Sequence, residues 1–117
     1  MRLGECTFGG RIPLALAPLA GYSDAAFRML CRNYGADWTV CEMISTDALT
    51  LSRRRTKGFK KTLSLLAAEP EDHPLVAQLF GKEPERFAAA CKIVVESAPV
   101  EGIDLNAGCP VKKVVAS

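Results

Sequence analysis

Cys109 stands in a part of the sequence that is suited to chemistry. An asparagine, an alanine, a glycine, the cysteine and a proline follow one another in the stretch Asn106–Pro110, directly after a segment in which apolar and polar residues alternate. Glycine permits backbone conformations that other residues avoid, and proline fixes φ and removes a hydrogen-bond donor. A thiol between them is expected on a shaped turn and not in a packed core. Because a thiol is mostly protonated near neutral pH, it can donate a proton from such a turn.

The other cysteines have structural explanations. Five cysteines are an odd number, none pairs as C-x-x-C, and His73 is the one histidine. We therefore expect no metal site and no disulfide framework. Two cysteines fall on apolar helical stripes, which predicts that they are buried as small hydrophobic side chains: Cys31 with Phe27, Leu30 and Tyr34, and Cys91 with Phe87 and Val94.

The elements that must position Cys109 alternate between strand and helix. Strand, helix, strand, helix, strand, helix, strand is the order of βαβ units, which predicts a parallel sheet. The strand segments are apolar nearly throughout, as expected when both faces of a sheet are covered. The expected strands span residues 13–18, 37–43, 74–81 and 102–106; the expected helices run from a cap at Ser23 or Asp24 to Gly35, lie between Thr46 and Arg55, and span 83–98 with Pro84 in the first turn.

Polar or backbone-exposing residues recur where each of these strands ends. In parallel α/β folds the functional residues gather at the carboxyl ends of the strands. Neither G-x-G-x-x-G nor G-x-x-x-x-G-K-[ST] occurs in the sequence, so the Rossmann and P-loop types of nucleotide site are excluded. The residues at the four strand ends are Pro18–Gly21, Glu42 with Met43, Gln78, and Asn106–Pro110.

Charge and hydrophobicity exclude further classes of protein. A net charge of +2 is too small to indicate a polyanionic partner by itself. No apolar run approaches the roughly 18 residues of a membrane span, and the first residues lack the apolar core of a signal peptide. We therefore expect a cytoplasmic protein without a membrane partner.

Four motifs together resemble the tRNA-dihydrouridine synthases. They are "APLAGYSD", "EMIS", "VAQLFG" and "DLNAGCPVKKVV", in the order and spacing of that family, and the resemblance runs from Pro13 to Ser117. Members of the family are flavin enzymes built on an eight-fold βα (TIM) barrel that is followed by a small helical domain. The family usually has methionine where Leu19 stands, and this change keeps the bulk and the apolar character.

The resemblance implies an enzyme that reduces the C5–C6 double bond of uracil in folded tRNA, using FMN that is recharged by NADPH. In the family, the cysteine that matches Cys109 is the general acid, which supplies a proton to one carbon while hydride reaches its neighbour. Lys112 and Lys113 lie close to it in sequence and would favour the thiolate if they faced it.

Further site residues carry over from the family by position. Pro18, Leu19 and Ala20 match the first loop, which contacts FMN mainly through its backbone. Gln78 matches the glutamine that hydrogen-bonds the flavin ring, since an amide both donates and accepts. Asn106 matches the asparagine that holds the target uracil. Glu42 and Met43 lie near the pocket in the family, and we assign them no chemical role.

The resemblance covers only the first part of the family's fold. A complete barrel needs about 250 residues, so residues 1–117 are expected to form a partial FMN-binding domain, the N-terminal half of the barrel. The second half and the helical tRNA-binding domain are expected to be absent, which would leave the chain inactive alone. Such a half-barrel exposes sheet edges and an apolar interior, which permit self-association.

The sequence leaves three alternative interpretations of function undecided. The basic stretch 53–61 could contact tRNA phosphates, although a solvated helix face is the favoured interpretation. The chain could instead belong to another FMN barrel oxidoreductase that acts on free pyrimidines, although "NAGCPVKKVV" and "APLAGYSD" argue against it. It could also be a non-catalytic half-barrel that binds RNA or a partner, and such a module would not need its thiol.

Overall fold

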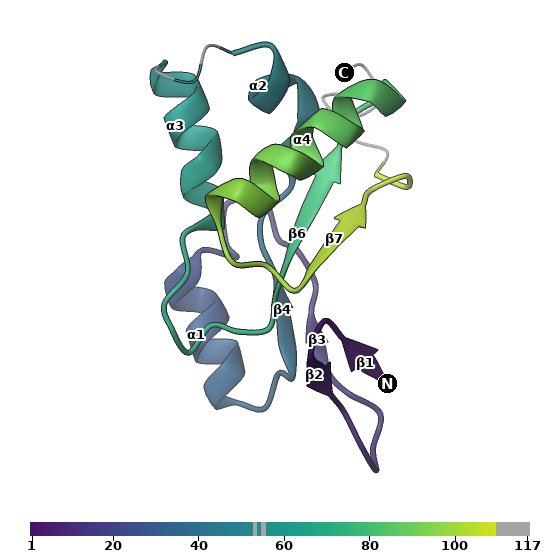
Figure 1. Cartoon of the computed structure of the whole chain (residues 1–117). Coiled ribbons are helices and arrows are strands. Elements are labelled where there is room, and N and C mark those ends of the chain that lie inside the picture. Colours follow the sequence, from purple (N-terminus) through teal and green to yellow (C-terminus); the bar gives the residue numbers. More distant parts are fainter. Residues whose placement is uncertain (53, 55, 110–117) are drawn as a thin grey trace.

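A parallel sheet with helices along one side forms the body of the molecule (Figure 1). The computed structural model describes residues 1–52, 54 and 56–109. A short antiparallel hairpin precedes the sheet. The strands are β1 (Arg2–Leu3), β2 (Cys6–Thr7), β3 (Ala15–Leu16), β4 (Trp38–Val40), β5 (Ile44–Ser45), β6 (Leu75–Phe80) and β7 (Gly102–Leu105), and the helices are α1 (Ala25–Asn33), α2 (Thr46–Thr50), α3 (Lys57–Leu63), the 3₁₀ helix η1 (Ser64–Leu66) and α4 (Pro84–Ser97).

The strands β3 to β7 all run parallel, as the βα order predicts. β4 and β5 pair with the same edge of β6, and β7 pairs with its other edge. The prediction of a single strand over residues 37–43 is wrong in its bounds. The strand β4 ends at Val40, and a separate strand, β5, begins at Ile44. Four residue steps lead from Val40 to Ile44, but only three lead between their partners on β6, Val76 and Leu79. One extra residue thus makes a bulge next to the carboxyl ends of the strands, where bulges re-aim side chains.

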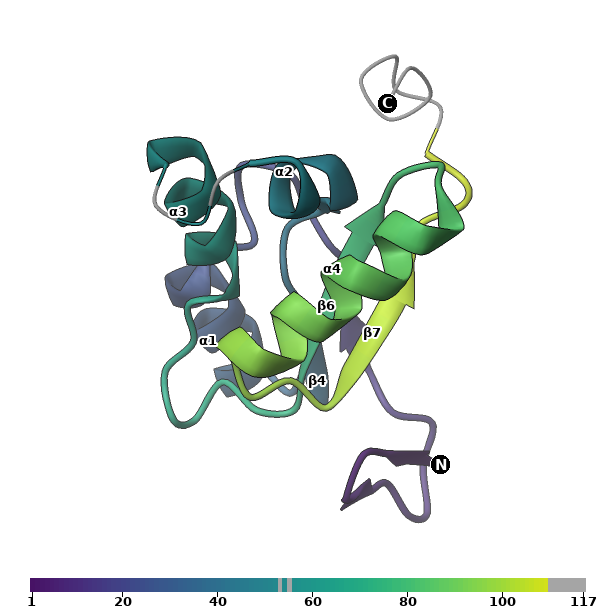
Figure 2. The same ribbon diagram turned by 45° about the horizontal axis from the view of Figure 1, so that its top comes forward.

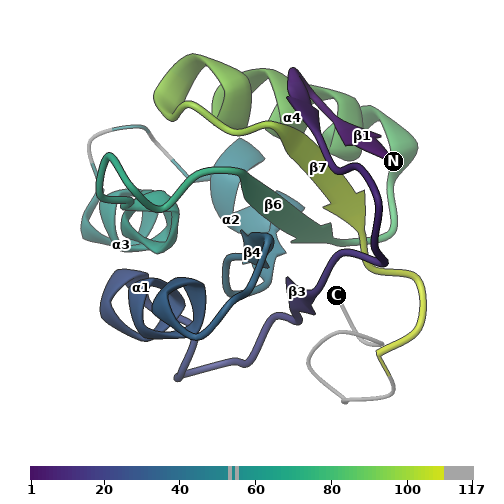
Figure 3. The same cartoon turned by 90° about the horizontal axis from the view of Figure 1, so that it is seen from below.

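The core lies between the sheet and the helices. Alternate residues of β6, namely Leu75, Ala77 and Leu79, are fully buried and belong to one cluster with Ala90 and Val94 of α4. Seen from below, α1, α3 and α4 lie along one side of the curved sheet (Figure 3), and turning the molecule shows α4 crossing over β6 and β7 (Figure 2). The opposite face of β6 therefore carries the intervening residues, Gln78 among them.

The N-terminal segment packs against the amino ends of the strands. The ring of Phe8 lies 5.4 Å from that of Trp38, and a side chain at Gly102 would meet Leu3 of β1 at 3.2 Å. Arg11 and the backbone N–H of Leu14 both bind the carboxylate of Asp37. This hairpin side of the molecule, which the sequence patterns did not predict, is thus opposite the strand ends that carry the site.

These contacts predict how acid affects the N-terminal segment. The N–H of Leu14 and the guanidinium of Arg11 hold the pKa of Asp37 below its ordinary value. A lowered pKa stabilises the fold above the unfolded-state value of about 3.9, and this contribution is lost as pH falls through the folded-state pKa. We therefore expect Asp37→Asn to destabilise the chain at pH 7 and to make no difference at strongly acidic pH. Urea unfolding of both proteins from pH 7 to about pH 2, followed by the fluorescence of Trp38, measures this; a difference that stays constant over the whole range would contradict it.

Two helical predictions need correction. Of the expected helix 46–55, residues 46–50 are helical and the described residues 51, 52 and 54 are not; residues 53 and 55 lie outside the described residues. Helix α3 was not predicted. On α1 the stripe around Cys31 is wrong as a buried face, because Leu30 is 51% and Tyr34 85% exposed. Arg28 is instead the buried residue of this helix, so a charged side chain that finds partners outweighs the apolar pattern.

The other sequence signals around these helices are confirmed. Asp24 caps α1 by accepting from the N–H of Phe27, and Gly35 follows its end with φ at +102°. Pro84 occupies the first turn of α4. Cys91 packs beside the core cluster, as its stripe predicts, although it is half-buried and not fully buried.

Gly81 allows β6 to approach the start of α2 closely. A Cβ at Gly81 would lie 2.0 Å from Oγ1 of Thr46, a side chain that is fully buried. We expect Gly81→Ala to lower the free energy of unfolding by about 1–3 kcal/mol, because overpacking forces the backbone to shift. Gly58→Ala is the matched control, since Gly58 lies in helix α3 with open space around it; it should be neutral or stabilising by up to about 1 kcal/mol. Equal losses in both variants would contradict the argument.

No helix within residues 1–52, 54 and 56–109 is long and apolar enough to cross a membrane.

Candidate functional site

Asn106 holds the turn that carries Cys109. Its side-chain Oδ1 accepts from the backbone N–H groups of Gly108 at 3.1 Å and Cys109 at 3.0 Å. Asparagine favours such turns because its short side chain reaches the backbone two or three residues further on. The backbone N–H of Asn106 also donates to the carbonyl of Leu79 at 2.8 Å. The position of the half-buried Cys109 is therefore fixed to the ends of both β6 and β7.

Gln78 is joined to this turn from the neighbouring strand. Its side chain is buried, at 7% exposure, and its Oε1 accepts from Nδ2 of Asn106 at 3.1 Å. Its Nε2 donates to Oδ2 of Asp104 at 2.5 Å. Gln78 and Asp104 are paired in register across β6 and β7, and Asn106 lies two residues beyond Asp104. Side chains of paired residues, and of residues two apart in a strand, project from one face, so the three meet there.

The first loop is folded by Ser23. The Ser23 hydroxyl donates to the carbonyl of Leu19 and accepts from its N–H, at 3.1 and 3.0 Å. Gly21 adopts a φ of +80°, which glycine tolerates. This turn leaves Leu19 and Ala20 exposed and Pro18 half-buried.

Glu42 and Met43 connect the first loop with the thiol-bearing turn. A carboxylate oxygen of Glu42 accepts from the N–H of Gly21 at 2.6 Å. Nδ2 of Asn106 donates to the sulfur of the adjacent Met43 at 3.0 Å. Both residues follow β4 at the bulge, so one short segment reaches both loops.

Among the expected site residues, the described structure thus brings Gln78, Asn106 and Cys109 into one hydrogen-bonded group. Pro18, Leu19 and Ala20 lie in a loop joined to that group through Gly21, Glu42 and Met43, and not by a direct hydrogen bond within the described residues. Pro110, Lys112 and Lys113 lie outside the described residues.

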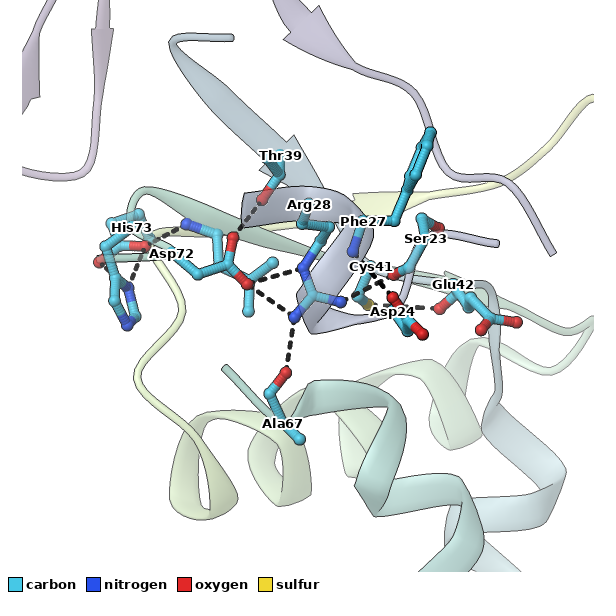
Figure 4. A network of polar contacts seen from close by, with 12 residues as sticks. Ser23, Asp24, Phe27, Arg28, Thr39, Cys41, Glu42, Ala67, Asp72 and His73 are labelled. Atoms are coloured by element: carbon cyan, nitrogen blue, oxygen red, sulfur yellow. Dashed lines mark hydrogen bonds and ion pairs between the residues drawn. The ribbon is translucent and has the colours of Figure 1, made fainter. Parts of the chain in front are cut away.

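A buried ion pair supports the first loop through the backbone of Ser23 (Figure 4). Arg28 donates through Nε to Asp72 at 2.8 Å, and the two side chains are 1% and 0% exposed. The same guanidinium donates to the carbonyls of Ser23 at 2.8 Å and Ala67 at 2.5 Å. Asp72 also accepts from the hydroxyl of Thr39 at 3.0 Å. Arg28 therefore ties together α1, β4, the segment before β6 and the residue that folds the first loop.

Sequence reasoning missed Asp104, and with it the support from Arg28 and Asp72. For Asp104 a signal existed, since a charged residue two positions before Asn106 in a strand must lie on the same face. The pair of Arg28 and Asp72 joins residues 44 apart in sequence, and no local pattern indicates such a pairing.

The remaining cysteines do not share the environment of Cys109. Burial raises the pKa of the Cys41 thiol above its ordinary value, so this thiol stays neutral and unreactive. Cys31 and Cys91 are half-buried on α1 and α4. In the described part of the chain, no three histidine, cysteine or acidic side chains are grouped so that they could hold a metal ion.

The basic stretch lies on and before α3. Arg54 forms an exposed ion pair with Glu96 at 3.7 Å, and Lys57 and Lys60 are exposed. Arg53 and Arg55 lie outside the described residues. The described part of the stretch therefore has the geometry of a solvated helix face.

The hydrogen-bonded group can bind the edge of a planar heterocycle. An amide side chain offers two N–H donors and two acceptor lone pairs. Among the described residues, Gln78 uses one of each in the bonds described above, which leaves one donor and one acceptor that a ligand could use. The edges of flavin and uracil carry N–H and C=O groups side by side, which is the complementary pattern.

Comparisons with known proteins identify relatives of the chain. A family model described as dihydrouridine synthase matches residues 15–117. A probable tRNA-dihydrouridine synthase of Treponema pallidum is 39% identical over 98 residues, which are 84% of this chain and 27% of that protein. A tRNA-dihydrouridine synthase B of Pseudomonas aeruginosa is 39% identical over 114 residues, 97% of this chain and 32% of that protein. The chain thus spans between a quarter and a third of the length of these curated relatives.

Proposed function

Because the chain belongs to the dihydrouridine synthase family, we propose that it forms the part of a tRNA-dihydrouridine synthase that protonates uracil. The reaction is the reduction of uridine to 5,6-dihydrouridine in tRNA, in the cytoplasm. The observation that carries the proposal is the bonded group of Gln78, Asn106 and the Cys109 turn at the carboxyl ends of adjacent parallel strands.

Cys109 is the general acid in this proposal. Its turn is held through two backbone N–H groups by Asn106, so the thiol has a defined position relative to β6 and β7. FMN held by Gln78 and the first loop, and recharged by NADPH, would supply hydride to one carbon of the uracil double bond. The thiol gives its proton to the neighbouring carbon and is then reprotonated from solvent. A positioned general acid of this kind contributes about 10²–10⁴-fold to rate.

The residues present fit the flavin ring. Within the described part of the chain, Gln78 keeps one donor and one acceptor for the ring edge. It lies on the sheet face opposite to the one that α4 covers. Pro18, Leu19 and Ala20 present an exposed loop to the same end of the sheet. Gly21 leaves open space where a Cβ would stand, which allows a flat ring to approach that backbone closely.

Asn106 is proposed to hold the uracil through an exchange of partners. Both of its Oδ1 lone pairs are used by the N–H groups of Gly108 and Cys109, and its Nδ2 donates to Gln78 and to the sulfur of Met43. A thioether sulfur is a weak acceptor. A uracil carbonyl can therefore replace Met43 at small cost, while the turn that carries Cys109 stays intact.

The remaining barrel and the tRNA-contacting surface are expected to come from outside these residues. We propose that the 117-residue chain is inactive alone and that its open sheet edge permits self-association. Activity is therefore to be tested in a chimera, in which residues 1–117 replace the matching segment of the Pseudomonas aeruginosa relative, 39% identical over 114 residues.

The experiment mixes the flavin-loaded, chemically reduced chimera with tRNA or with free uridine under anaerobic conditions. Return of the oxidised flavin absorbance with unmodified tRNA, and not with free uridine, is the expected result. Oxidation by free pyrimidines alone would favour the other class of FMN barrel oxidoreductase. Tight RNA binding without any change in the flavin would favour a non-catalytic binding module, and the unmodified Pseudomonas aeruginosa protein serves as the positive control.

A further inference from the structure

The structure assigns Asp104 the role of a positioning residue: we infer that its carboxylate sets the direction of a hydrogen-bond relay that ends at the backbone of Cys109. The relay runs from Asp104 through the amides of Gln78 and Asn106 to the N–H groups of Gly108 and Cys109. This inference deepens the proposed function, and its importance for turnover rests on that function.

Both ends of the relay have a fixed hydrogen-bonding character. An ionised carboxylate only accepts, so the Asp104 end requires an N–H from Gln78. A backbone N–H only donates, so the Gly108 and Cys109 end requires an oxygen from Asn106. These two requirements come from groups that cannot reverse their roles.

The two amides between the ends can each be turned in either sense, and only one combination satisfies both ends. Nε2 of Gln78 faces Asp104, which turns Oε1 toward Asn106. Nδ2 of Asn106 then faces Oε1 of Gln78 at 3.1 Å, which turns Oδ1 toward the backbone N–H groups. The direction demanded by the carboxylate is thus the direction demanded by the turn.

Loss of the carboxylate removes one of the two constraints. An asparagine at position 104 can present either its oxygen or its N–H groups, so the turn alone then favours the original sense, and the Gln78 amide also gains access to the opposite sense. When the Gln78 amide is turned over, its N–H groups face the N–H groups of Asn106, and two donors cannot form a hydrogen bond with each other. Asn106 must then turn as well, and the bonds to Gly108 and Cys109 are lost.

The test compares the unmodified chain with Asp104→Asn by amide hydrogen exchange, measured by NMR. Exchange at Gly108 and Cys109 is expected to become about fivefold faster, the factor that corresponds to the loss of one typical hydrogen bond. Asp47→Asn is the matched control, because it removes an acidic group that binds Arg86 between α2 and α4; it should leave both amides unchanged. Alkylation of Cys41, which is fully buried, reports in every sample whether the chain is folded.

A second variant tests whether the effect depends on the donor-to-acceptor direction of the relay. In the double variant Gln78→Glu/Asp104→Asn the carboxylate moves to position 78, where it can accept from position 104 and from Asn106 together. The direction of the relay is then restored, and slow exchange at Gly108 and Cys109 should return.

Each outcome decides the inference. Unchanged exchange in Asp104→Asn with Cys41 still protected would overturn it. If Asp104→Asn exposes Cys41, the double variant decides: a protected Cys41 with slow exchange supports the relay, and continued exposure or fast exchange refutes it. Because the experiment needs neither flavin nor tRNA, its failure leaves the proposed reaction standing, and a failure of the reaction leaves the relay standing.

Discussion

Replacing Cys109 by alanine in the chimera is expected to slow the oxidation of its reduced flavin by tRNA at least about 100-fold. The reason is that a positioned general acid contributes about 10²–10⁴-fold, and alanine has no proton to give. Reduction of the flavin by NADPH should be unchanged, because that step needs no proton from the thiol. Anaerobic stopped-flow measurement of the flavin absorbance separates the two steps.

Cys6→Ala is the matched control for this prediction. Cys6 lies in β2 of the hairpin, at the opposite end of the sheet from the Cys109 turn, so both steps should proceed at the unmodified rates. If Cys109→Ala oxidised as fast as Cys6→Ala, Cys109 would not be the acid. If both steps slowed together, the effect would be on cofactor binding and not on proton transfer.

Arg28→Ala is expected to cost about 3–5 kcal/mol of unfolding free energy in the chain. Removing one partner of a buried ion pair leaves an uncompensated charge, here that of Asp72, which is fully buried. The carbonyls of Ser23 and Ala67 lose a donor in the same step. Because Ser23 folds the first loop, flavin affinity of the chimera should fall as well. Urea unfolding followed by Trp38 fluorescence measures the stability, and a flavin titration measures the affinity.

The control for Arg28 is the exposed pair of Arg54 and Glu96, whose side chains are 71% and 64% exposed. Arg54→Ala should change stability by less than about 1 kcal/mol, as is usual for surface ion pairs. A loss of the same small size in Arg28→Ala would show that the buried network does not stabilise the fold.

Long elements and strand ends could be predicted from the sequence. β6 and α4 lie within one residue of their expected bounds because an unbroken apolar run and a Pro84 start are strong local signals. Gln78, Asn106 and Cys109 were found because the carboxyl ends of parallel strands meet at one edge of a sheet. Their roles in catalysis stay predictions, which the experiments above test.

The features that the sequence did not predict depend on contacts between residues that are distant in sequence. A helical stripe predicted Leu30 and Tyr34 as buried, but Arg28 occupies that place because Asp72, 44 residues away, neutralises it. The bulge after Val40 follows from the register with β6, which no strand pattern encodes. Local sequence signals thus predict where the proposed site residues lie better than they predict the residues that support them.

The central claim is that residues 1–117 supply the acid for making dihydrouridine in tRNA. Its most direct test is nucleoside mass spectrometry of tRNA from bacteria that lack their own dihydrouridine synthases and express the chimera. Dihydrouridine is expected in tRNA from cells with the unmodified chimera and with Cys6→Ala, and none or only traces are expected with Cys109→Ala at equal protein level. Full dihydrouridine content with Cys109→Ala, or none with a folded, flavin-loaded chimera, would contradict it.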